Sequence, residues 1–487
     1  MLKFQSTEEV KLPKDPLDMV IGQEKAVKLS RIAIRQRRHL LLVGPPGVGK
    51  SMLAKALAYH LPKPNEEILV YHNPRNPERP GIGLRSIEDM RREEKAERVA
   101  RGKLKNPTEV PAFVAERMGL RCRHCSEYSN STEEICPKCS QYKGNEEVDY
   151  TPFSDLMSKV FNVGFSEYPE EEVHVTRMDK DGNEEIIIYQ NVDGKNVRVI
   201  DKDAFESLSL IEKRKRSKIL IPIKRNLFVQ ATGASETELL GDVKHDPWGG
   251  LPEAGGLPPY QRVIPGAVHE AHEGVLYVDE LPQLQKLQHY ILTAMQEKHF
   301  PITGMNPGSS GAAVKVNRVP CDFIFIGACN INEIEGILPP LRSRIVGSGY
   351  ELLLENSMPK TKENEEKMAQ FFAQEVLMDR KIPHGSFKAV KALIDESERR
   401  AREVDDKPNE LTLRLRDLAG VIRLAGDAAK MDGKELIDKE HIKQAIKDSQ
   451  SVEQQIVEKY GSIWKGKAKD SNVDKIVTNQ NKAVGYR

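Results

Sequence analysis

The sequence lacks a long hydrophobic run, a bias toward either sign of charge, and enough cysteines for a disulfide-stabilised scaffold. No stretch reaches the roughly 18 apolar residues that cross a bilayer, and the first ten residues lack the apolar core of a secretory signal. The 74 basic and 73 acidic side chains nearly cancel, which excludes a global field that attracts nucleic acid or anionic membrane. We therefore expect a cytoplasmic protein without a membrane-bound segment.

A chain of 487 residues is long enough for two or three domains of roughly 100–200 residues each. Short apolar runs that alternate with helical spacing predict an α/β core, and a later stretch of helical spacing alone predicts an all-α lid. The predicted parts are an α/β core in 1–80 and 227–352, an insertion with a charged helix, a cysteine cluster and β-hairpins in 81–226, the lid in 353–455, and a tail or linker in 456–487.

A phosphate-binding loop follows the first apolar run, at 39–43, and precedes a predicted helix. Its glycines let the backbone N–H groups face phosphate oxygens, and the helix N-terminus adds a favourable dipole. The lysine would reach the β- and γ-phosphates of ATP, and the serine hydroxyl would bind Mg²⁺. The loop consists of Gly44, Pro45, Pro46, Gly47, Val48, Gly49, Lys50 and Ser51.

An acidic pair, Asp279 and Glu280, directly follows the apolar run at 275–278. Phosphoryl transfer needs a carboxylate that positions Mg²⁺ and a group that polarises water, so we assign the first role to Asp279 and the second to Glu280. A strand that ends in an acidic helix cap is the alternative. The phosphate loop favours the catalytic interpretation.

Asn330 follows a further apolar run, at 323–329, and is predicted to reach the same edge of the sheet. There its amide could hold the attacking water and the γ-phosphate. An asparagine after a strand is commonly a turn residue, but its place in the chain after the acidic pair favours the catalytic role.

Two regions carry arginines suited to the terminal phosphate. Arg344, which follows two prolines and is favoured over Arg342, could project into a neighbouring subunit's site as an arginine finger. Arg416, in the predicted lid, is placed to contact the γ-phosphate and report the nucleotide state. The alternatives are ordinary surface arginines for the first pair and a solvated helix face for Arg416.

Four of the six cysteines form the pattern C-x₂-C-x₁₀-C-x₂-C. Two such pairs supply four thiolates for tetrahedral Zn²⁺, and four thiolates leave no open position for catalysis. A small insertion with little apolar content needs folding energy from a metal. We therefore predict a structural zinc ribbon, with His124 exposed rather than a ligand, and with the ligands Cys122, Cys125, Cys136 and Cys139.

The order of these motifs resembles the AAA+ ATPase part of archaeal-type Lon protease, LonB, over about residues 13–80 and 227–460. The resemblance implies a P-loop AAA+ fold, a homo-hexameric ring, and ATP-driven threading of polypeptide through a central pore. Tyr260 is similar to the aromatic pore residue of that family, although Gln261 stands where an apolar residue is expected. The resemblance also includes the segments 231–234, 239–247, 293–298, 301–304 and 341–344.

Two departures from that family matter. The family's membrane-spanning hairpin lies in the insertion, whereas this insertion has no apolar span and carries the cysteine cluster. The family continues into a peptidase domain with a Ser–Lys dyad, whereas this sequence stops at Arg487, about where that domain would begin. We expect a form without a membrane anchor. Either the sequence is truncated before the peptidase domain, or the motor works with a separate peptidase or as an unfoldase alone.

Two other functions remain open. A nucleic-acid remodelling ATPase could use the zinc ribbon, but it predicts salt-sensitive binding that the balanced charge does not favour. A chaperone similar to the MoxR or chelatase ATPases would use the insertion to dock a dedicated partner.

Overall fold

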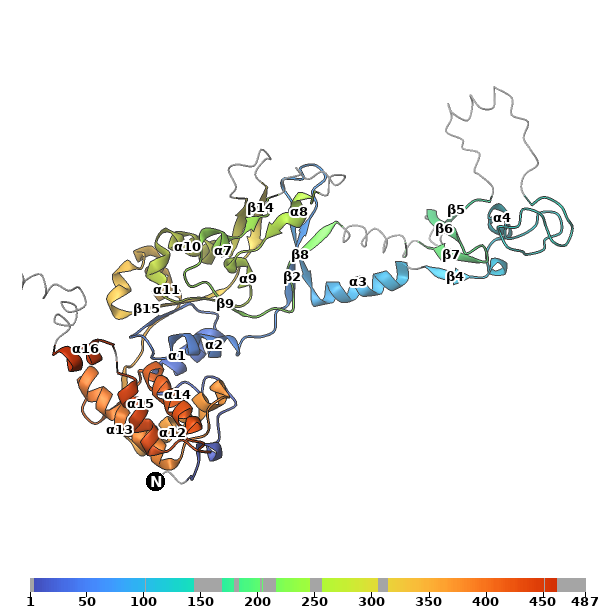
Figure 1. The fold of residues 1–487 in the computed structure, drawn as a ribbon. Helices are drawn as coiled ribbons and strands as arrows, with labels where there is room; N and C mark the ends of the chain where they lie inside the picture. The colour runs from blue at the N-terminus through green and yellow to red at the C-terminus, as the bar shows by residue number, and fades with distance from the viewer. Residues whose placement is uncertain are drawn as a thin grey trace, which may run out of the picture.

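The computed structural model describes residues 4–100, 102–143, 169–178, 184–201, 204, 216–245, 256–304, 314–450 and 452–461. An α/β core lies between a helical lid, which includes the N-terminus, and a long projecting arm (Figure 1). None of the helices within these ranges combines the length and apolar character needed to cross a membrane.

The core is built on a five-stranded parallel sheet with the order β16-β1-β15-β12-β9. In that order the strands are Tyr350–Leu353, Leu40–Val43, Ile324–Cys329, Val275–Val278 and Phe228–Gln230. This arrangement confirms the predicted α/β fold class. β1 lies between β15 and β16, the last two strands of the set along the chain. Because all the pairs are parallel, the connections between these strands cross over the sheet.

Side chains alternate between the two faces of the sheet along each strand, and the side chains on both faces are buried. Leu40 and Leu42 pack toward α1 (Glu24–Arg35) and α2 (Lys50–Ala58). Leu41 and Val43 pack on the other face. The helices there are α7 (Glu236–Leu240), α9 (Ala267–Glu270), α10 (Gln288–Glu297) and α11 (Pro339–Ser348). The sheet is therefore the middle of three layers.

The apolar run at 68–71 does not join the core sheet, contrary to the predicted boundary at residue 81. Strand β2 (Glu66–Tyr71) pairs instead with β3 (Gly81–Ser86) and β8 (Ser217–Ile221) in an antiparallel sheet. The insertion therefore begins before β2. A run of four apolar residues predicts a buried strand but does not specify which strand it pairs with.

Two hairpins project from the core beside this small sheet. One contains β10 (Asp242–Val243), α8 (Pro259–Arg262) and β11 (Val263–Ile264), and the other pairs β13 (His299–Thr303) with β14 (Lys315–Pro320). Apolar residues from both hairpins and from β2 and β8 form one buried cluster. The base of the arm and the two hairpins thus share a core.

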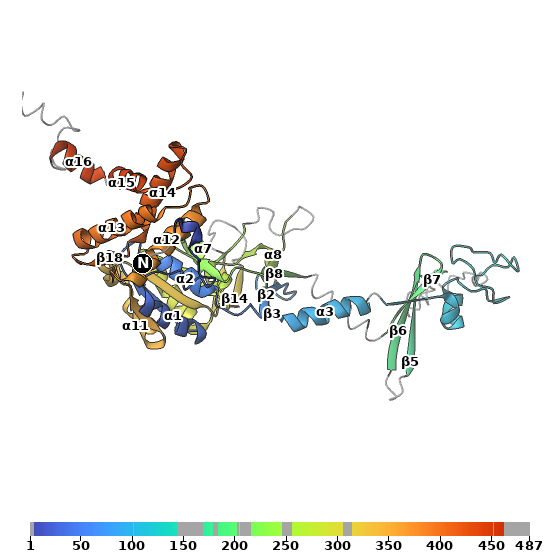
Figure 2. The ribbon, with the colours of Figure 1, turned by 90° about the horizontal axis from the view of Figure 1, so that it is seen from below.

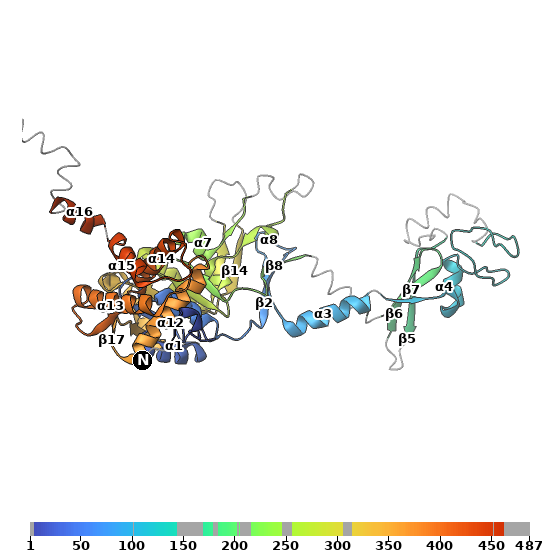
Figure 3. The ribbon, with the colours of Figure 1, turned by 60° about the horizontal axis from the view of Figure 1, so that its bottom comes forward.

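The arm leads away from this cluster through α3 (Ile87–Ala100), and all three views place its far end well apart from the core (Figures 1, 2 and 3). That end holds α4 (Ala112–Arg117) and a four-stranded sheet of order β4-β7-β6-β5. The turn between β6 and β7 contains Asp193 and Gly194, both with positive φ, the conformation that two-residue hairpin turns require. The strands are Lys103–Lys105, Asn196–Ile200, Glu184–Val192 and Glu172–Met178.

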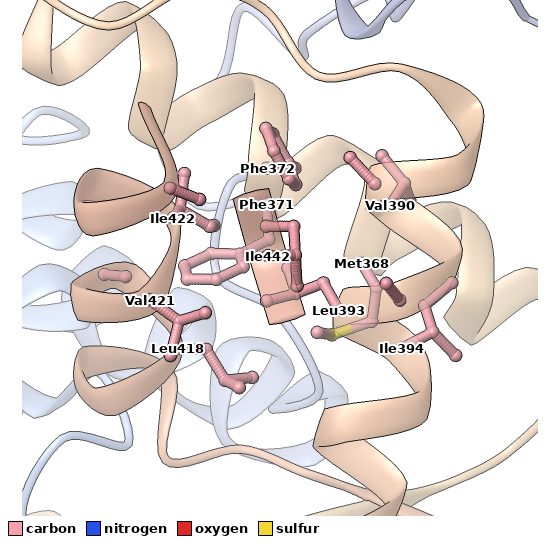
Figure 4. Close-up of a cluster of buried hydrophobic side chains, with 14 of the residues drawn as sticks. Met368, Phe371, Phe372, Val390, Leu393, Ile394, Leu418, Val421, Ile422 and Ile442 are labelled. Carbon is pink, nitrogen blue, oxygen red and sulfur yellow. The ribbon is translucent and has the colours of Figure 1, made fainter. Parts of the chain in front are cut away.

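The lid packs four helices around a core that includes Met368, Leu393, Leu418 and Ile442 (Figure 4). They are α12 (Lys362–Asp379), α13 (Phe387–Val404), α14 (Leu415–Met431) and α15 (Lys439–Asp448), and α16 (Val452–Tyr460) follows. The lid is helical as predicted, and one short antiparallel pair that the sequence did not predict, β17 (Ser357–Pro359) with β18 (Glu410–Thr412), is added to it.

The N-terminal segment belongs to the lid rather than to the core in which the sequence placed it. The ring of Phe4 meets Phe387 edge to face at 5.9 Å. Thr7 is buried, and its hydroxyl accepts a hydrogen bond from the backbone N–H of Gly385. This packing is long-range and leaves no periodic signal in the sequence.

Candidate nucleotide site and metal centre

The carboxyl ends of β1, β12 and β15 meet at one edge of the core sheet, where open parallel sheets form ligand sites. The three predicted motifs follow these strands and come together around a cavity of about 230 Å³. The cavity is lined by Pro46, Gly47, Gly49, Lys50, Ser51, Met52, Asp279, Glu280, Cys329, Asn330 and Arg416. The structure therefore brings most of the predicted catalytic and phosphate-binding residues together at one site. Gly44, Pro45, Val48 and Arg344 are not among the residues that line it.

The phosphate loop adopts a conformation that needs glycine, since Gly47 and Gly49 have φ values of 83° and 94°. Gly49 directly precedes α2, so the first N–H groups of this helix face the cavity. Lys50 is only 8% exposed. Its Nζ donates to the carbonyl oxygens of Gly44 at 2.7 Å and Pro45 at 3.1 Å. Burial lowers the pKa of Lys50, and the Asp279 carboxylate opposes that shift.

The residues predicted to bind Mg²⁺ are adjacent. The hydroxyl of Ser51 donates to Asp279 Oδ2 at 3.2 Å, so a hydroxyl and a carboxylate, the oxygen ligands that Mg²⁺ takes, lie side by side. When bound, Mg²⁺ would neutralise the charge that develops on the phosphates. The oxygen atoms of Ser51 and Asp279 fit Mg²⁺ as ligands, and phosphate and water oxygens would supply its other ligands.

Two neighbours of Asp279 were missed by the sequence reasoning. The hydroxyl of Tyr277 lies 3.0 Å from Ser51 Oγ, and burial raises the pKa of Tyr277. Thr232 Oγ1 accepts a hydrogen bond of 3.1 Å from the Asp279 backbone N–H. Tyr277 could have been found, because residues two apart on a strand lie on the same face. Thr232 follows β9, and only the sheet order brings it here.

Glu280 and Asn330 flank the cavity on adjacent strands. Glu280 has a left-handed backbone (φ 52°), an uncommon conformation for a residue with Cβ, and its carboxylate accepts a hydrogen bond of 2.6 Å from Gln283. Asn330 Oδ1 accepts from Lys50 Nζ at 3.1 Å, and its Nδ2 donates to Glu333. Both side chains are thus held by neighbouring groups where they line the cavity.

Arg416 reaches the cavity from the lid. Its Cβ lies so near Gly47 that a Cβ built on that glycine would be 3.1 Å away. The neighbouring Arg414 has a different role, because it forms an ion pair at 2.9 Å with the buried carboxylate of Asp405. Arg416 is exposed, and no ion pair to it is found among the described residues.

The two arginines of α11 also differ. Arg342 pairs with Glu351 at 2.5 Å, whereas Arg344 is exposed and has no ion pair within the described ranges. Arg344 is close enough to His39 to help lower that residue's pKa to about 4, after the larger effect of burial. Arg344 is not among the residues that line the cavity at its own phosphate loop.

Tyr260 does not have the exposure that the pore assignment requires. It lies in α8, is 7% exposed, belongs to the cluster shared by the hairpins and the arm, and has its ring 5.8 Å from that of His72. A ring packed in a core cannot grip a passing chain, so the structure does not support this expectation. The sequence shows an aromatic residue but not the surroundings that bury it.

The four cysteines converge at the far end of the arm, with their sulfur atoms within 4.8 Å of one another. The Cys122 and Cys139 sulfurs are 3.7 Å apart, and those of Cys125 and Cys136 are 3.5 Å apart. Tetrahedral Zn²⁺ with Zn–S bonds of about 2.3 Å needs sulfur atoms roughly 3.8 Å apart. The thiols fit such an ion, and His124 is exposed as predicted.

A buried lysine supports the cysteine loops. Lys143 is 0% exposed, and its Nζ donates to Gly119 O at 3.1 Å, Ser129 Oγ at 2.7 Å and Asn130 O at 2.8 Å. Ser126 and Ser140, each directly after a cysteine pair, have positive φ and donate a backbone N–H to the first cysteine of the pair. The two halves of the cluster therefore share one local geometry.

Comparison with known proteins agrees with this site. Residues 16–73 match the family "Magnesium chelatase, subunit ChlI" and residues 384–451 match "Archaeal LonB, AAA+ ATPase LID domain". A protein of Methanothermobacter thermautotrophicus named "Putative lon protease homolog" is 51% identical over 96% of this chain and 93% of its own length. A protein of the same name in Thermoplasma volcanium is 51% identical over 95% of this chain and 92% of its own length.

Relatives named "Archaeal Lon protease" are longer. That of Thermococcus kodakarensis is 37% identical over 94% of this chain, which spans 63% of that relative's length. The similarity covers the phosphate loop, the acidic pair, Asn330 and the lid. The chain therefore belongs to the archaeal Lon family of AAA+ ATPases.

Proposed function

We propose that this ATPase assembles into a ring, a homo-hexamer by its resemblance to LonB, in which ATP hydrolysis drives the unfolding or translocation of polypeptide. Membership of the Lon family supports this proposal. The lid contributes Arg416 to a cavity formed mainly by the core, so nucleotide binding and release would change how lid and core are joined.

Within a subunit, the geometry supports distinct roles for the residues around the cavity. Lys50 and the loop N–H groups would bind the phosphates, and Ser51 with Asp279 would hold Mg²⁺. Glu280 would polarise the attacking water, and Asn330 would orient it. Because Glu280 and Asn330 follow the adjacent strands β12 and β15, they can act on one water from neighbouring positions.

The observation that carries the ring is the contrast between Arg342 and Arg344. Arg342 is paired with Glu351, whereas Arg344 is exposed on the same helix and lies away from its own cavity. The described cations that line the cavity are Lys50 and Arg416. A trans-acting arginine would complete the charge stabilisation that phosphoryl transfer needs, and Arg344 is suited to that role.

We further propose that Cys122, Cys125, Cys136 and Cys139 hold a structural zinc ion. The distances between their sulfur atoms support this assignment. The far end of the arm has a small apolar core of its own, and metal binding would contribute folding free energy beside it.

The ring and its substrate can be tested together. The Glu280→Gln variant should trap an ATP-bound ring, and light scattering would measure the mass of that ring. The wild type should unfold a fluorescent protein that carries an unstructured tail, and it should do so only when ATP is hydrolysed. A monomer in saturating ATP would contradict the ring. ATPase activity stimulated by DNA and lost with salt, without any unfolding, would instead favour nucleic-acid remodelling.

A further inference from the structure

Gln288 is a fully buried polar residue at the first position of α10, and its side chain joins α10 to the segment ahead of α11. Its Nε2 donates to the carbonyl oxygen of Gly336 at 3.0 Å, and its Oε1 accepts from the backbone N–H of Leu338 at 2.9 Å. One carboxamide therefore holds this segment through both a carbonyl and an N–H. The two helices pack together along the same face of the sheet (Figure 1).

The segment held by Gln288 sets the start of the helix that carries Arg344. Leu338 is the N-cap of α11, and its carbonyl accepts the backbone N–H of Arg342 at 3.0 Å. Pro339 and Pro340 follow, and because proline has no N–H, the Leu338 N–H is the last backbone donor before them. With Leu338 fixed by Gln288, the direction in which α11 leaves the segment is fixed too.

The same junction is connected to the proposed catalytic carboxylate. Glu280 is the N-cap of the 3₁₀ helix Leu281–Leu287, which ends where α10 begins. Pro282 in this helix packs so closely on Gly336 that a Cβ built on the glycine would lie 2.8 Å from Pro282 Cβ. Gln285 has φ 44° and ψ −116°, a sparsely populated backbone region for a residue with Cβ. The connection from Glu280 to Gln288 is thus held in an uncommon shape against Gly336.

We propose that Gln288 is a positioning residue for the arginine finger: it aligns α11, and with it Arg344, to the segment that follows Glu280. This inference rests on the proposed trans action of Arg344. Its consequence is that the residue acts on the neighbouring subunit's site and not on the nucleotide bound by its own subunit. Misplacement of a catalytic group by about 1 Å can lower a rate roughly 10²-fold, so loss of Gln288 should be measurable.

Mixed rings separate these two sites. A Lys50→Ala subunit binds no nucleotide but supplies a finger, and an Arg344→Ala subunit supplies a pocket but no finger, so their mixture should hydrolyse ATP. Adding Gln288→Ala to the finger-supplying subunit should lower the activity of the mixture by about 10-fold or more. Adding it to the pocket-supplying subunit should leave the activity within about twofold. His289→Ala, an exposed neighbour on α10, is the matched control.

A second variant guards against misfolding of Gln288→Ala. Gln288→Met keeps the approximate volume of the side chain but can neither donate to Gly336 nor accept from Leu338, and it should show the same loss only on the finger side. Native mass spectrometry would confirm equal co-assembly in each mixture. Equal losses on both sides, or no loss on either, would overturn this inference alone. An inactive parent mixture that co-assembles would overturn the trans action of Arg344, and this inference with it.

Discussion

Lys50 and Asn330 meet at the carboxyl edge of the core sheet, where the lysine Nζ donates a hydrogen bond of 3.1 Å to the asparagine Oδ1. The other donors of this ammonium group are directed at the carbonyls of Gly44 and Pro45. An ammonium group has three donors, so a phosphate that binds Lys50 must replace at least one of these partners. If the hydrogen bond from Lys50 to Asn330 is the one that breaks, the Asn330 amide becomes available to the γ-phosphate and the attacking water.

Asn330→Ala should therefore keep nucleotide affinity near the wild-type value and lower kcat by roughly 10²-fold, the usual effect of removing one preorganised polar contact to the reacting group. ATP binding would be measured by calorimetry and turnover by phosphate release. A variant with a much higher Kd and an unchanged kcat would show that Asn330 serves binding rather than catalysis.

Glu280→Gln should bind ATP and Mg²⁺ but lose turnover by about 10²–10⁴-fold, because the amide cannot accept a proton from the attacking water. Glu297→Gln removes an exposed carboxylate from the end of α10 and is the matched control. Retention of hydrolysis in Glu280→Gln would contradict the assignment of the water-polarising residue.

The sequence was sufficient to predict the nucleotide site because its motifs are local and each follows its own strand. Lys50, Asp279 and Asn330 needed only the rule that carboxyl ends of parallel strands meet at one edge. The sequence did not specify that β9, rather than β2, is the edge strand beside β12. Both segments are short and apolar, and their partners are chosen by tertiary packing.

Burial was harder to predict than secondary structure. In α1 both Ile32 and Ile34 are apolar, but Ile32 is 37% exposed whereas Ile34 is 3% exposed. Tyr260 was expected at the surface and lies in a core. Such errors arise because a helix shows which residues share a face, whereas the contacting element decides which face is covered.

Zinc binding should be lost selectively in Cys136→Ser. The purified wild type should contain about one zinc ion per chain by metal analysis, because four thiolates at these distances form one tetrahedral site. The variant should lose the metal and become sensitive to proteolysis in the arm, while ATP affinity stays unchanged. Cys321→Ala, which removes a buried thiol outside the cluster, should retain the metal. Wild-type protein purified without chelators and free of zinc would contradict the assignment.

Acid should destabilise the core through His269. This side chain is fully buried, its Nδ1 accepts the backbone N–H of Gly266, and its Nε2 lies 3.0 Å from the Phe300 carbonyl. Burial lowers its pKa from 6.5 to about 4. Because the folded pKa is below the unfolded value, the unfolded state binds more protons as the pH falls, and stability decreases from about pH 6.5 to pH 4.

The difference between the folded and unfolded pKa values of His269 should lower the free energy of unfolding by about 2 kcal/mol between pH 7 and pH 5. Urea unfolding at both pH values would measure it. His269→Gln keeps a donor and an acceptor but does not titrate, so its stability should depend less on pH over this range by about the same amount. An identical pH dependence in the variant and the wild type would rule out His269 as the cause.

Arg344→Ala should bind ATP with wild-type affinity but lose about 10³–10⁵-fold in hydrolysis, because the missing guanidinium stabilises the transition state in the neighbouring subunit. Arg342→Ala is the matched control, since Arg342 lies on the same helix as Arg344 but pairs with Glu351 of β16. It should retain most of the activity.

Mixing Arg344→Ala with Lys50→Ala tests whether Arg344 acts across the interface between two subunits. Lys50→Ala lacks the lysine that binds phosphate, so each variant alone should be inactive. In mixed rings some interfaces join an intact pocket to an intact Arg344, and ATPase activity should reappear and peak near equal proportions. If the mixture stays inactive while native mass spectrometry shows that the two proteins co-assemble, Arg344 does not act in trans. The exposed guanidinium on α11 would then be a surface charge, and the ring would need another residue to complete its active site.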